Sequence, residues 1–178
     1  MKQSQNGDKI RYLVVTGVIA GLYTTLTLVL APISYGMVQC RLSEALTVLA
    51  AYTPAAIPGL TIGCVFANLL GGSQPLDIVV GSFATFLAAW LSYRLRNIRF
   101  GGLPILSTIP PVVCNAVIIG VEMTLLMGPR TFTTLFLWMG WVGLGQLVAC
   151  VGGGLLLAYS FKKTGFAAQL EQNSFTNR

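Results

Sequence analysis

Apolar residues occur in six runs along the chain, and short stretches rich in Gly, Pro or charged residues separate them. About 20 apolar residues are enough for a helix to cross the hydrocarbon core of a bilayer. The runs predict transmembrane helices at about 10–31, 43–54, 58–71, 76–93, 111–127 and 133–161. We therefore expect an all-α integral membrane protein, a bundle of six transmembrane helices in a single membrane domain over residues 1–178.

The stretches between the runs contain residues that start and stop helices. Ser43 is placed to cap the second helix, with Glu44 in its first turn. The segment Gly128-Pro129-Arg130 separates the last two helices. The polar residues 1–9 and 162–178 are expected to form two tails, of which the first is frayed.

The composition agrees with a membrane protein and excludes several kinds of chemistry. Only 9% of the residues are charged and 54% are hydrophobic, whereas a soluble domain carries about a quarter charged residues. Histidine is absent, which excludes His-based acid–base catalysis and His metal ligation. The four cysteines form no Cys-x-x-Cys pair, and the sequence has no Gly-x-x-x-x-Gly-Lys-Ser/Thr phosphate loop. We therefore expect no metal, no cofactor and no ATP bound through such a loop.

The distribution of basic residues orients the bundle. With six spans, both termini and the loop between the fourth and fifth helices lie on one side of the membrane. That side would carry nine of the 11 Lys and Arg residues, namely Lys2, Lys9, Arg11, Arg94, Arg96, Arg99, Lys162, Lys163 and Arg178. Only Arg41 and Arg130 would lie on the other side. The positive-inside rule then predicts an N-in, C-in topology, and it explains the net charge of +6 without nucleic acid as a partner.

In this orientation the polar residues of the spans lie toward the outer face. Glu44 and Asp77 begin helices from outside, and Glu122 lies in the outer half of the fifth helix. Ionisable residues in spans are costly and are functional candidates by default. Asn68 lies near the outer end of the third helix, and Asn115 shares a helix face with Glu122. Trp138 lies near the outer start of the sixth helix, and Gln146 lies about two turns deeper. The pattern predicts an outward-facing polar pocket whose main determinant is Glu122, the only acid well inside a span.

Each candidate also has a purely structural interpretation. Glu122 and Asn115, which share a helix face, could form interhelical hydrogen bonds. Arg41 and Glu44 are three residues apart and could form a local salt bridge near water, where such pairs contribute about 0–1 kcal/mol. Asp77 could be an acid favoured by the positive end of its helix, and Trp138 an aromatic residue of the membrane interface.

The first helix contains two pairs of small residues with a spacing of four. They are Gly17 with Gly21 and Ala20 with Thr24. Small residues at this spacing allow another helix to approach closely. They could pack within the bundle or dock a partner protein, and the sequence leaves both interpretations open.

Several segments together carry a family pattern: VQCRLSEALT at 38–47, TPAAIPGL at 53–60, DIVVGS at 77–82 with AT at 84–85, PPVVCNA at 110–116 and GVE at 120–122. They resemble the queuosine-precursor transporter family, and the resemblance extends over about residues 14–154. Two positions depart from the family pattern. Gln146 stands where a glutamate is expected, and Thr24 stands where an Ala-x-x-x-Ala docking motif has its second alanine.

The resemblance implies a substrate-binding subunit, or S-component, of an energy-coupling-factor (ECF) vitamin transporter. Such subunits have six helices and a site near the outer face, closed by the first loop. Here that loop is 32–41, with Tyr35, Gln39 and Arg41; Tyr35 or Trp138 could stack on a flat ligand. Such subunits work with a membrane coupling protein and two ATPases in the bacterial cytoplasmic membrane, so the chain itself would not be an enzyme.

The resemblance further implies capture of a 7-deazaguanine precursor of queuosine without any chemical step. Such a ring presents adjacent N–H donors on one edge and a carbonyl acceptor. Glu122 would accept from the donors, and Asn115 or Gln146 would serve the carbonyl. An aminomethyl cation on the ring would need a second acid, Glu44 or Asp77.

Two other function classes compete with this interpretation. A stand-alone proton-coupled secondary carrier for a small nucleobase-like solute would use Glu122 as its proton site, but the sequence has no inverted repeat. An intramembrane enzyme is the weakest alternative, because the chain has no histidine and its acids are isolated.

Overall fold

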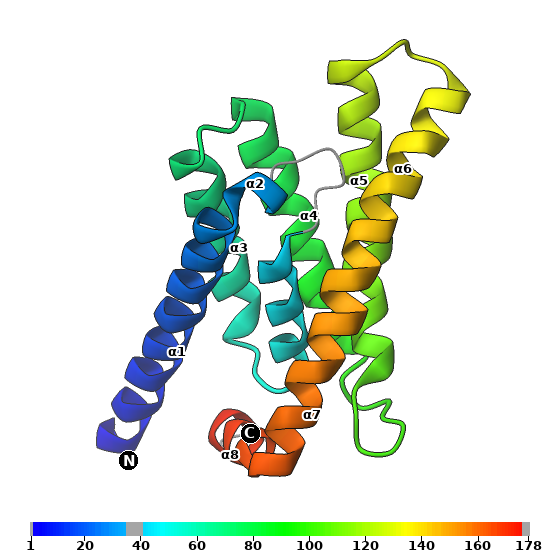
Figure 1. The fold of residues 1–178 in the computed structure, drawn as a ribbon. Helices are drawn as coiled ribbons and strands as arrows, with labels where there is room; N and C mark the ends of the chain where they lie inside the picture. The colour runs from blue at the N-terminus through cyan, green and yellow to red at the C-terminus, as the bar shows by residue number, and fades with distance from the viewer. Residues whose placement is uncertain (1, 35–40, 176–178) are drawn as a thin grey trace.

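The computed structural model describes residues 2–34 and 41–175, with side chains described for 6–34 and 41–172. Its regular elements are helices (Figure 1). In chain order they are α1 (Lys2–Val29), α2 (Ala31–Ser34), η1 (Leu42–Ala51), α3 (Ala56–Leu70), α4 (Pro75–Arg94), η2 (Ile105–Thr108), α5 (Ile109–Met127), α6 (Phe132–Gln146), η3 (Leu147–Gly153), α7 (Gly154–Thr164) and α8 (Phe166–Phe175).

The longer elements run alternately up and down the bundle, and both ends of the chain lie at the same end of it (Figure 1). In the described residues, four helical segments have the length and hydropathy to cross a membrane: Asn6–Val29, Pro75–Arg94, Ile105–Met127 and Phe132–Thr164. The two other predicted spans correspond to η1 and α3, which are apolar but shorter. The structure therefore supports an all-α membrane protein, with four helices long enough to span.

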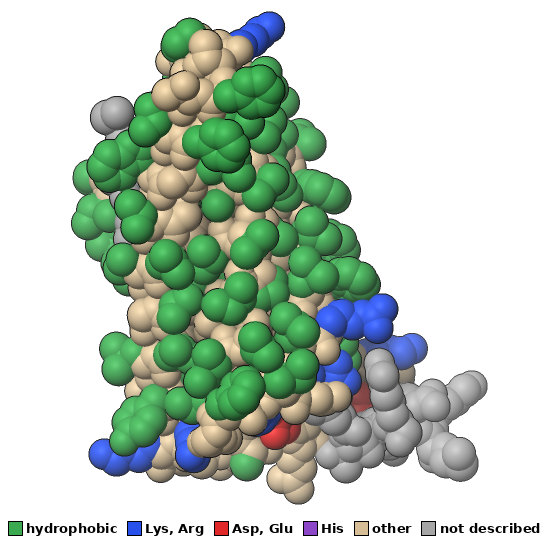
Figure 2. Space-filling view, turned by 90° about the vertical axis from the view of Figure 1, so that its right-hand side faces the viewer, with side chains coloured by type: hydrophobic (Ala, Val, Ile, Leu, Met, Phe, Trp, Pro, Cys, Tyr) green, Lys and Arg blue, Asp and Glu red, His purple; other side chains and the backbone are tan. Residues whose placement is uncertain are grey.

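The outer surface is that of a protein surrounded by lipid. Large apolar side chains are exposed on the long helices, among them Val18, Phe86, Val117 and Phe136. Figure 2 shows apolar side chains over the face formed by α5 and α6, with Lys and Arg side chains at its two ends and more of them at the lower end. At that end, Nζ of Lys162 donates to the backbone oxygen of Gly101 at 2.7 Å, so two of the basic segments lie together.

The two terminal segments differ from the prediction. Residues 2–9 form the first turns of α1, so the prediction of a frayed start is wrong for them. The polar segment after residue 162 contains α8, whose Phe166 ring lies 5.1 Å from the Phe161 ring of α7. Glu171 of α8 forms an ion pair with Arg99. The helix is therefore attached to the bundle on both its apolar and its charged side.

The short helix η1 lies in the middle of the bundle and packs against α1, α4, η3 and α7. Most of its residues are buried, including Ser43. The prediction that Ser43 caps this helix is wrong: the N-cap is Arg41, with no side-chain cap bond, and Oγ of Ser43 instead accepts from Thr27 Oγ1 at 2.7 Å. A buried hydroxyl satisfied by α1 fixes the position of η1 against that helix.

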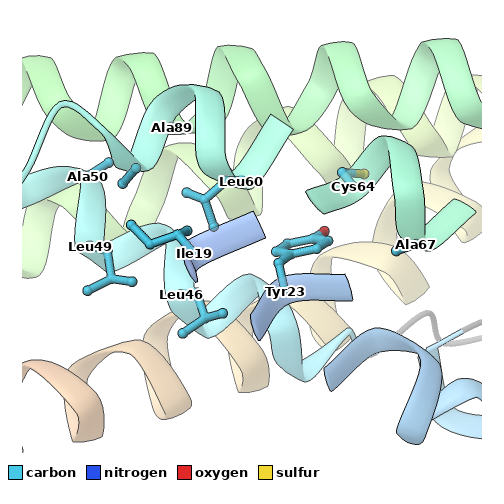
Figure 3. Close-up of a cluster of buried hydrophobic side chains, with 10 residues drawn as sticks. Ile19, Tyr23, Leu46, Leu49, Ala50, Leu60, Cys64, Ala67 and Ala89 are labelled. Atoms are coloured by element: carbon cyan, nitrogen blue, oxygen red, sulfur yellow. The ribbon is translucent and has the colours of Figure 1, made fainter. Parts of the chain in front are cut away.

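Glycines allow the closest contacts between helices. A Cβ atom on Gly63 of α3 would lie 2.8 Å from Cβ of Tyr23 and 2.9 Å from the backbone oxygen of Ala20. A Cβ atom on Gly120 of α5 would lie 2.6 Å from Cγ of Met139 on α6. Around the α1–α3 contact, apolar side chains from α1, η1 and α3 form a buried cluster (Figure 3).

Candidate functional site

Two small cavities adjoin one another between η1, α4 and α5, and Arg41, Gly81 and Ile119 line both. The first, which we call the amide cavity, is also lined by Glu44, Thr85, Asn115 and Gln146. The second, which we call the acid cavity, is also lined by Asp77, Glu122 and Met123. Each has a volume of about 10 Å³, which is room for about one water molecule.

Glu44 is held in the amide cavity by one of its two carboxylate oxygens. The residue is only 1% exposed. The hydroxyl of Tyr23 on α1 donates to Oε1, and Thr85 Oγ1 on α4 donates to the same oxygen at 3.3 Å. Among the described residues, Oε2 has no hydrogen-bond partner. One oxygen therefore fixes the side chain, and the other is left to accept from a ligand.

The burial of Glu44 decides between two interpretations of the sequence. The structural interpretation pairs this acid with Arg41 near water, and the position near water is wrong. Because η1 enters the bundle instead of lying along its edge, it carries Glu44 inside. Arg41 does interact electrostatically with Glu44, but this interaction lies within the protein.

Two amide side chains complete the amide cavity. Asn115 on α5 interacts electrostatically with Glu44, and Gln146 is the last residue of α6. Both are buried. Cys150 Sγ donates to Oε1 of Gln146 at 3.1 Å, one turn further along the chain. An amide offers both donors and acceptors, so this cavity can match a ligand edge that presents both.

The helix changes its winding directly after Gln146. Residues Leu147–Gly153 (η3) form a π-helical segment within the long run from α6 to α7. A π-helix is wound more widely than an α-helix and occurs mostly as a single-turn bulge within one. Such bulges are frequently found at functional sites. The apolar, Gly-rich sequence of this run gave no signal for it.

The acid cavity contains a carboxylate that no side chain satisfies. Glu122 is 3% exposed, and neither of its oxygens has a hydrogen-bond partner among the described residues. It interacts electrostatically with Asp77, in the first turn of α4, and with Arg41. Two ionised carboxylates can only accept, so when both acids are charged neither can satisfy the other. A buried acid without a partner is costly and needs a functional explanation.

Asn68 and Gly81 shape this region, and Oδ1 of Asn68 is itself buried without a hydrogen-bond partner among the described residues. Asn68 on α3 donates from Nδ2 to the backbone oxygen of Asp77 at 3.2 Å, which ties the end of α3 to the start of α4. A Cβ atom on Gly81 would lie 3.1 Å from that same nitrogen and 4.0 Å from Arg41. Asn68 lines neither cavity, so the structure gives it a positioning role.

The structure brings together most of the predicted site residues but not all of them. Arg41, Glu44, Asp77, Asn115, Glu122 and Gln146 meet at the two cavities. Trp138 lines neither cavity and is half-buried against the apolar cluster of α4, α5 and α6. Tyr35 and Gln39 lie outside the described residues.

Four cavity residues and one supporting residue were not predicted from the sequence. Gly81 and Thr85 stand in a quoted family segment, but a small residue on a helix gives no sign of where it points. Ile119 and Met123 look like ordinary core residues. Tyr23 could have been noticed as a hydroxyl group inside an apolar run, and its position on the buried side of α1 shows why it matters (Figure 3).

The predicted docking residues fall on different sides of α1. Gly17 and Gly21 are exposed, and a Cβ atom on either would meet nothing within 4 Å. Ala20 is buried at the contact with α3. Thr24 Oγ1 donates to the backbone oxygens of Ala20 and Gly63. Only the glycine pair therefore lies on a face left open for a partner.

Comparison with known proteins gives a family. Residues 13–163 match the family described as QueT transporter. A segment of 89 residues is 36% identical to the Queuosine precursor transporter QueT of Lactococcus lactis subsp. cremoris (strain MG1363), which covers 49% of this chain and 50% of that relative. The match thus spans half the length of that relative. No solved structure matches the chain. Because the family match extends over most of the chain, this protein belongs to the QueT transporter family.

Proposed function

We propose that this chain is the substrate-binding membrane subunit of an ECF transporter and that it captures a 7-deazaguanine precursor of queuosine for ATP-driven uptake. The name of the Lactococcus lactis relative supports the class of substrate. The observation that carries the proposal is the free Oε2 of Glu44 beside the amides of Asn115 and Gln146. A carboxylate next to amides matches the donor edge and the carbonyl of a guanine-like ring.

Binding would require a change of shape at the two cavities. Each has a volume of about 10 Å³, whereas sites for small ligands usually measure about 300–1,000 Å³. The shared lining residues Arg41, Gly81 and Ile119 separate cavities that a ring-sized ligand must join. We therefore propose that the ligand enters a more open form and that α4, α5 and η1 then close around it.

A binding titration tests the proposal directly. Isothermal calorimetry on detergent-purified protein should detect 7-deazaguanines bearing an aminomethyl or a nitrile group more strongly than guanine, and should detect no common vitamin. A preference for a vitamin, with no response to any 7-deazaguanine, would refute the assigned substrate.

A stand-alone proton-coupled carrier remains the second candidate, because a buried Glu122 without a partner would also suit a proton site. The two functions differ in what the purified chain does alone in lipid vesicles. A binding subunit binds substrate there without accumulating it, and uptake appears only with the coupling protein and the two ATPases. Accumulation driven by a pH gradient in vesicles with this chain alone would establish the carrier instead.

The orientation of the bundle can be tested by thiol labelling. We propose that both termini and the loop after α4 face the cytoplasm, because nine of the 11 basic residues lie on that side. In a cysteine-free background, Asn97→Cys should resist an impermeant thiol reagent in intact cells and react after lysis. Thr133→Cys, an exposed position at the start of α6, should react in intact cells. The reverse pattern would contradict the orientation.

The open face of α1 is the proposed surface for the coupling protein. Gly17→Leu should lower uptake by the complete transporter strongly while leaving substrate binding within about twofold, because none of the described residues lies within 4 Å of a Cβ atom at this position. The matched variant is Ala20→Leu, which faces α3 and should lower stability and binding together. If Gly17→Leu loses binding as Ala20→Leu does, this face packs internally.

A further inference from the structure

The acids at the two cavities form two chemically different groups, and Arg41 lines both cavities. In the amide cavity, Glu44 lies with Asn115 and Gln146. In the acid cavity, Glu122 lies with Asp77 and no amide. Three carboxylates thus surround one guanidinium, and that single positive charge offsets only one of them when all are ionised.

We propose that the two cavities are separate subsites for one ligand, and that Asp77 and Glu122 select a ligand with a cationic aminomethyl arm. The proposal rests on the 7-deazaguanine class of substrate given above and names which member of that class the site prefers. It assigns the base edge to Glu44, Asn115 and Gln146, and the substituent to the acid pair.

The chemistry of the acid cavity suits a cation. Glu122 presents two buried oxygens that accept no hydrogen bond from the described residues, and Oδ1 of Asp77 is likewise buried without a partner. A primary ammonium group has three N–H donors and a charge, so it can satisfy both carboxylates at once. A nitrile has neither donor nor charge, and would leave the buried oxygens of the two acids unsatisfied.

The chemistry of the amide cavity suits the edge of the base. Glu44 is already fixed through Oε1 by Tyr23 and Thr85, so Oε2 is in place to accept from a ring N–H or an exocyclic amine. The amides of Asn115 and Gln146 can then donate to the carbonyl. No net positive charge is needed on this side of the ligand.

The arrangement of the cavities matches the shape of such a ligand. In a 7-deazaguanine, the substituent is on the five-membered ring, and the donor edge belongs to the six-membered ring. The two groups therefore point to different sides of one flat molecule. The two cavities share Arg41, Gly81 and Ile119, so a ring lying between them would contact all three. Gly81 has no side chain to occupy that space.

The test compares two ligands on the same preparations. Dissociation constants for 7-aminomethyl-7-deazaguanine and 7-cyano-7-deazaguanine are measured by calorimetry on the parent protein and on Asp77→Asn, Glu122→Gln and Glu44→Gln. The parent should prefer the aminomethyl ligand. That preference should fall by about tenfold to a hundredfold in Glu122→Gln and by about tenfold in Asp77→Asn, as a charge-assisted hydrogen bond is lost. Glu44→Gln should weaken both ligands alike and keep the ratio within about threefold.

The ratio of the two constants does not depend on how much of each preparation is folded, so a partly unfolded variant still gives an answer. Glu171→Gln, whose ion pair with Arg99 lies at the opposite end of the bundle, should change neither constant. Equal affinity of the parent for both ligands, or a ratio that survives in Glu122→Gln and Asp77→Asn, overturns the subsite assignment and leaves the proposed function intact. A parent that binds no 7-deazaguanine refutes the proposed function, and the subsites with it.

Discussion

Replacing Glu44 with Gln is expected to lower the affinity for every 7-deazaguanine by about tenfold to a hundredfold. The hydroxyl groups of Tyr23 and Thr85 can still donate to the amide oxygen, so the side chain keeps its position. The free Oε2 becomes an NH₂ group, which replaces an acceptor by a donor facing the ligand's donor edge. The loss of one charge-assisted hydrogen bond is worth about 1.5–3 kcal/mol.

A neighbouring substitution provides the control for this loss. Thr85→Val removes a neutral donor from Oε1 at 3.3 Å but leaves the carboxylate and its free oxygen in place. Thr85→Val should cost about 0.5–1.5 kcal/mol of binding free energy, which is less than the cost of Glu44→Gln. Calorimetry on both variants, after gel filtration to verify folding, measures the difference. If Glu44→Gln binds like the parent, the base edge is recognised elsewhere.

Replacing Gly63 with Ala is expected to destabilise the protein by about 1–3 kcal/mol. The added methyl group would lie 2.8 Å from Cβ of Tyr23 and 2.9 Å from the backbone oxygen of Ala20, and at least the second of these cannot move without moving α1. The measurement is the midpoint of thermal unfolding in detergent, which should fall by several degrees.

The same substitution at Gly21 gives a matched comparison. It also adds one methyl group to a helical glycine, but on the open side of α1, where nothing lies within 4 Å. Ala is the better helix former, by up to about 1 kcal/mol, so Gly21→Ala should leave the midpoint unchanged or raise it. Equal midpoints for Gly63→Ala and Gly21→Ala would show that α1 and α3 do not pack as described.

Helix boundaries were predictable where proline or glycine marks them. The fourth helix was expected at 76–93 and is observed at Pro75–Arg94. The fifth helix was expected at 111–127, and its end at residue 127 is confirmed. It begins earlier, at Ile109, because two prolines are tolerated in the first turn of a helix. No such residue marks the start of α1, and a polar composition did not prevent residues 2–9 from continuing the helix.

The sequence predicted which residues are candidates better than it predicted which of them lie together. Arg41, Glu44, Asp77, Asn115, Glu122 and Gln146 all stood out as polar groups in or near apolar runs. Their pairing depends on the depth and rotation of η1, which carries Glu44 to α4 and α5. Spacing within one helix suggested that Asn115 and Glu122 act together, whereas the structure places them in different cavities. Contacts between helices cannot be read from the period of a single helix.

The hydrogen bond from Tyr23 to Glu44 attaches the buried face of α1 to η1. One side of this helix holds the carboxylate proposed to bind the ligand, and the opposite side carries the exposed glycines proposed to meet a partner. A partner that displaces α1 would alter the position of that carboxylate and so the affinity for the ligand. Thermodynamic linkage then requires the ligand to change the affinity for the partner by the same factor. A single helix would thus allow the proposed coupling protein to distinguish a loaded subunit from an empty one.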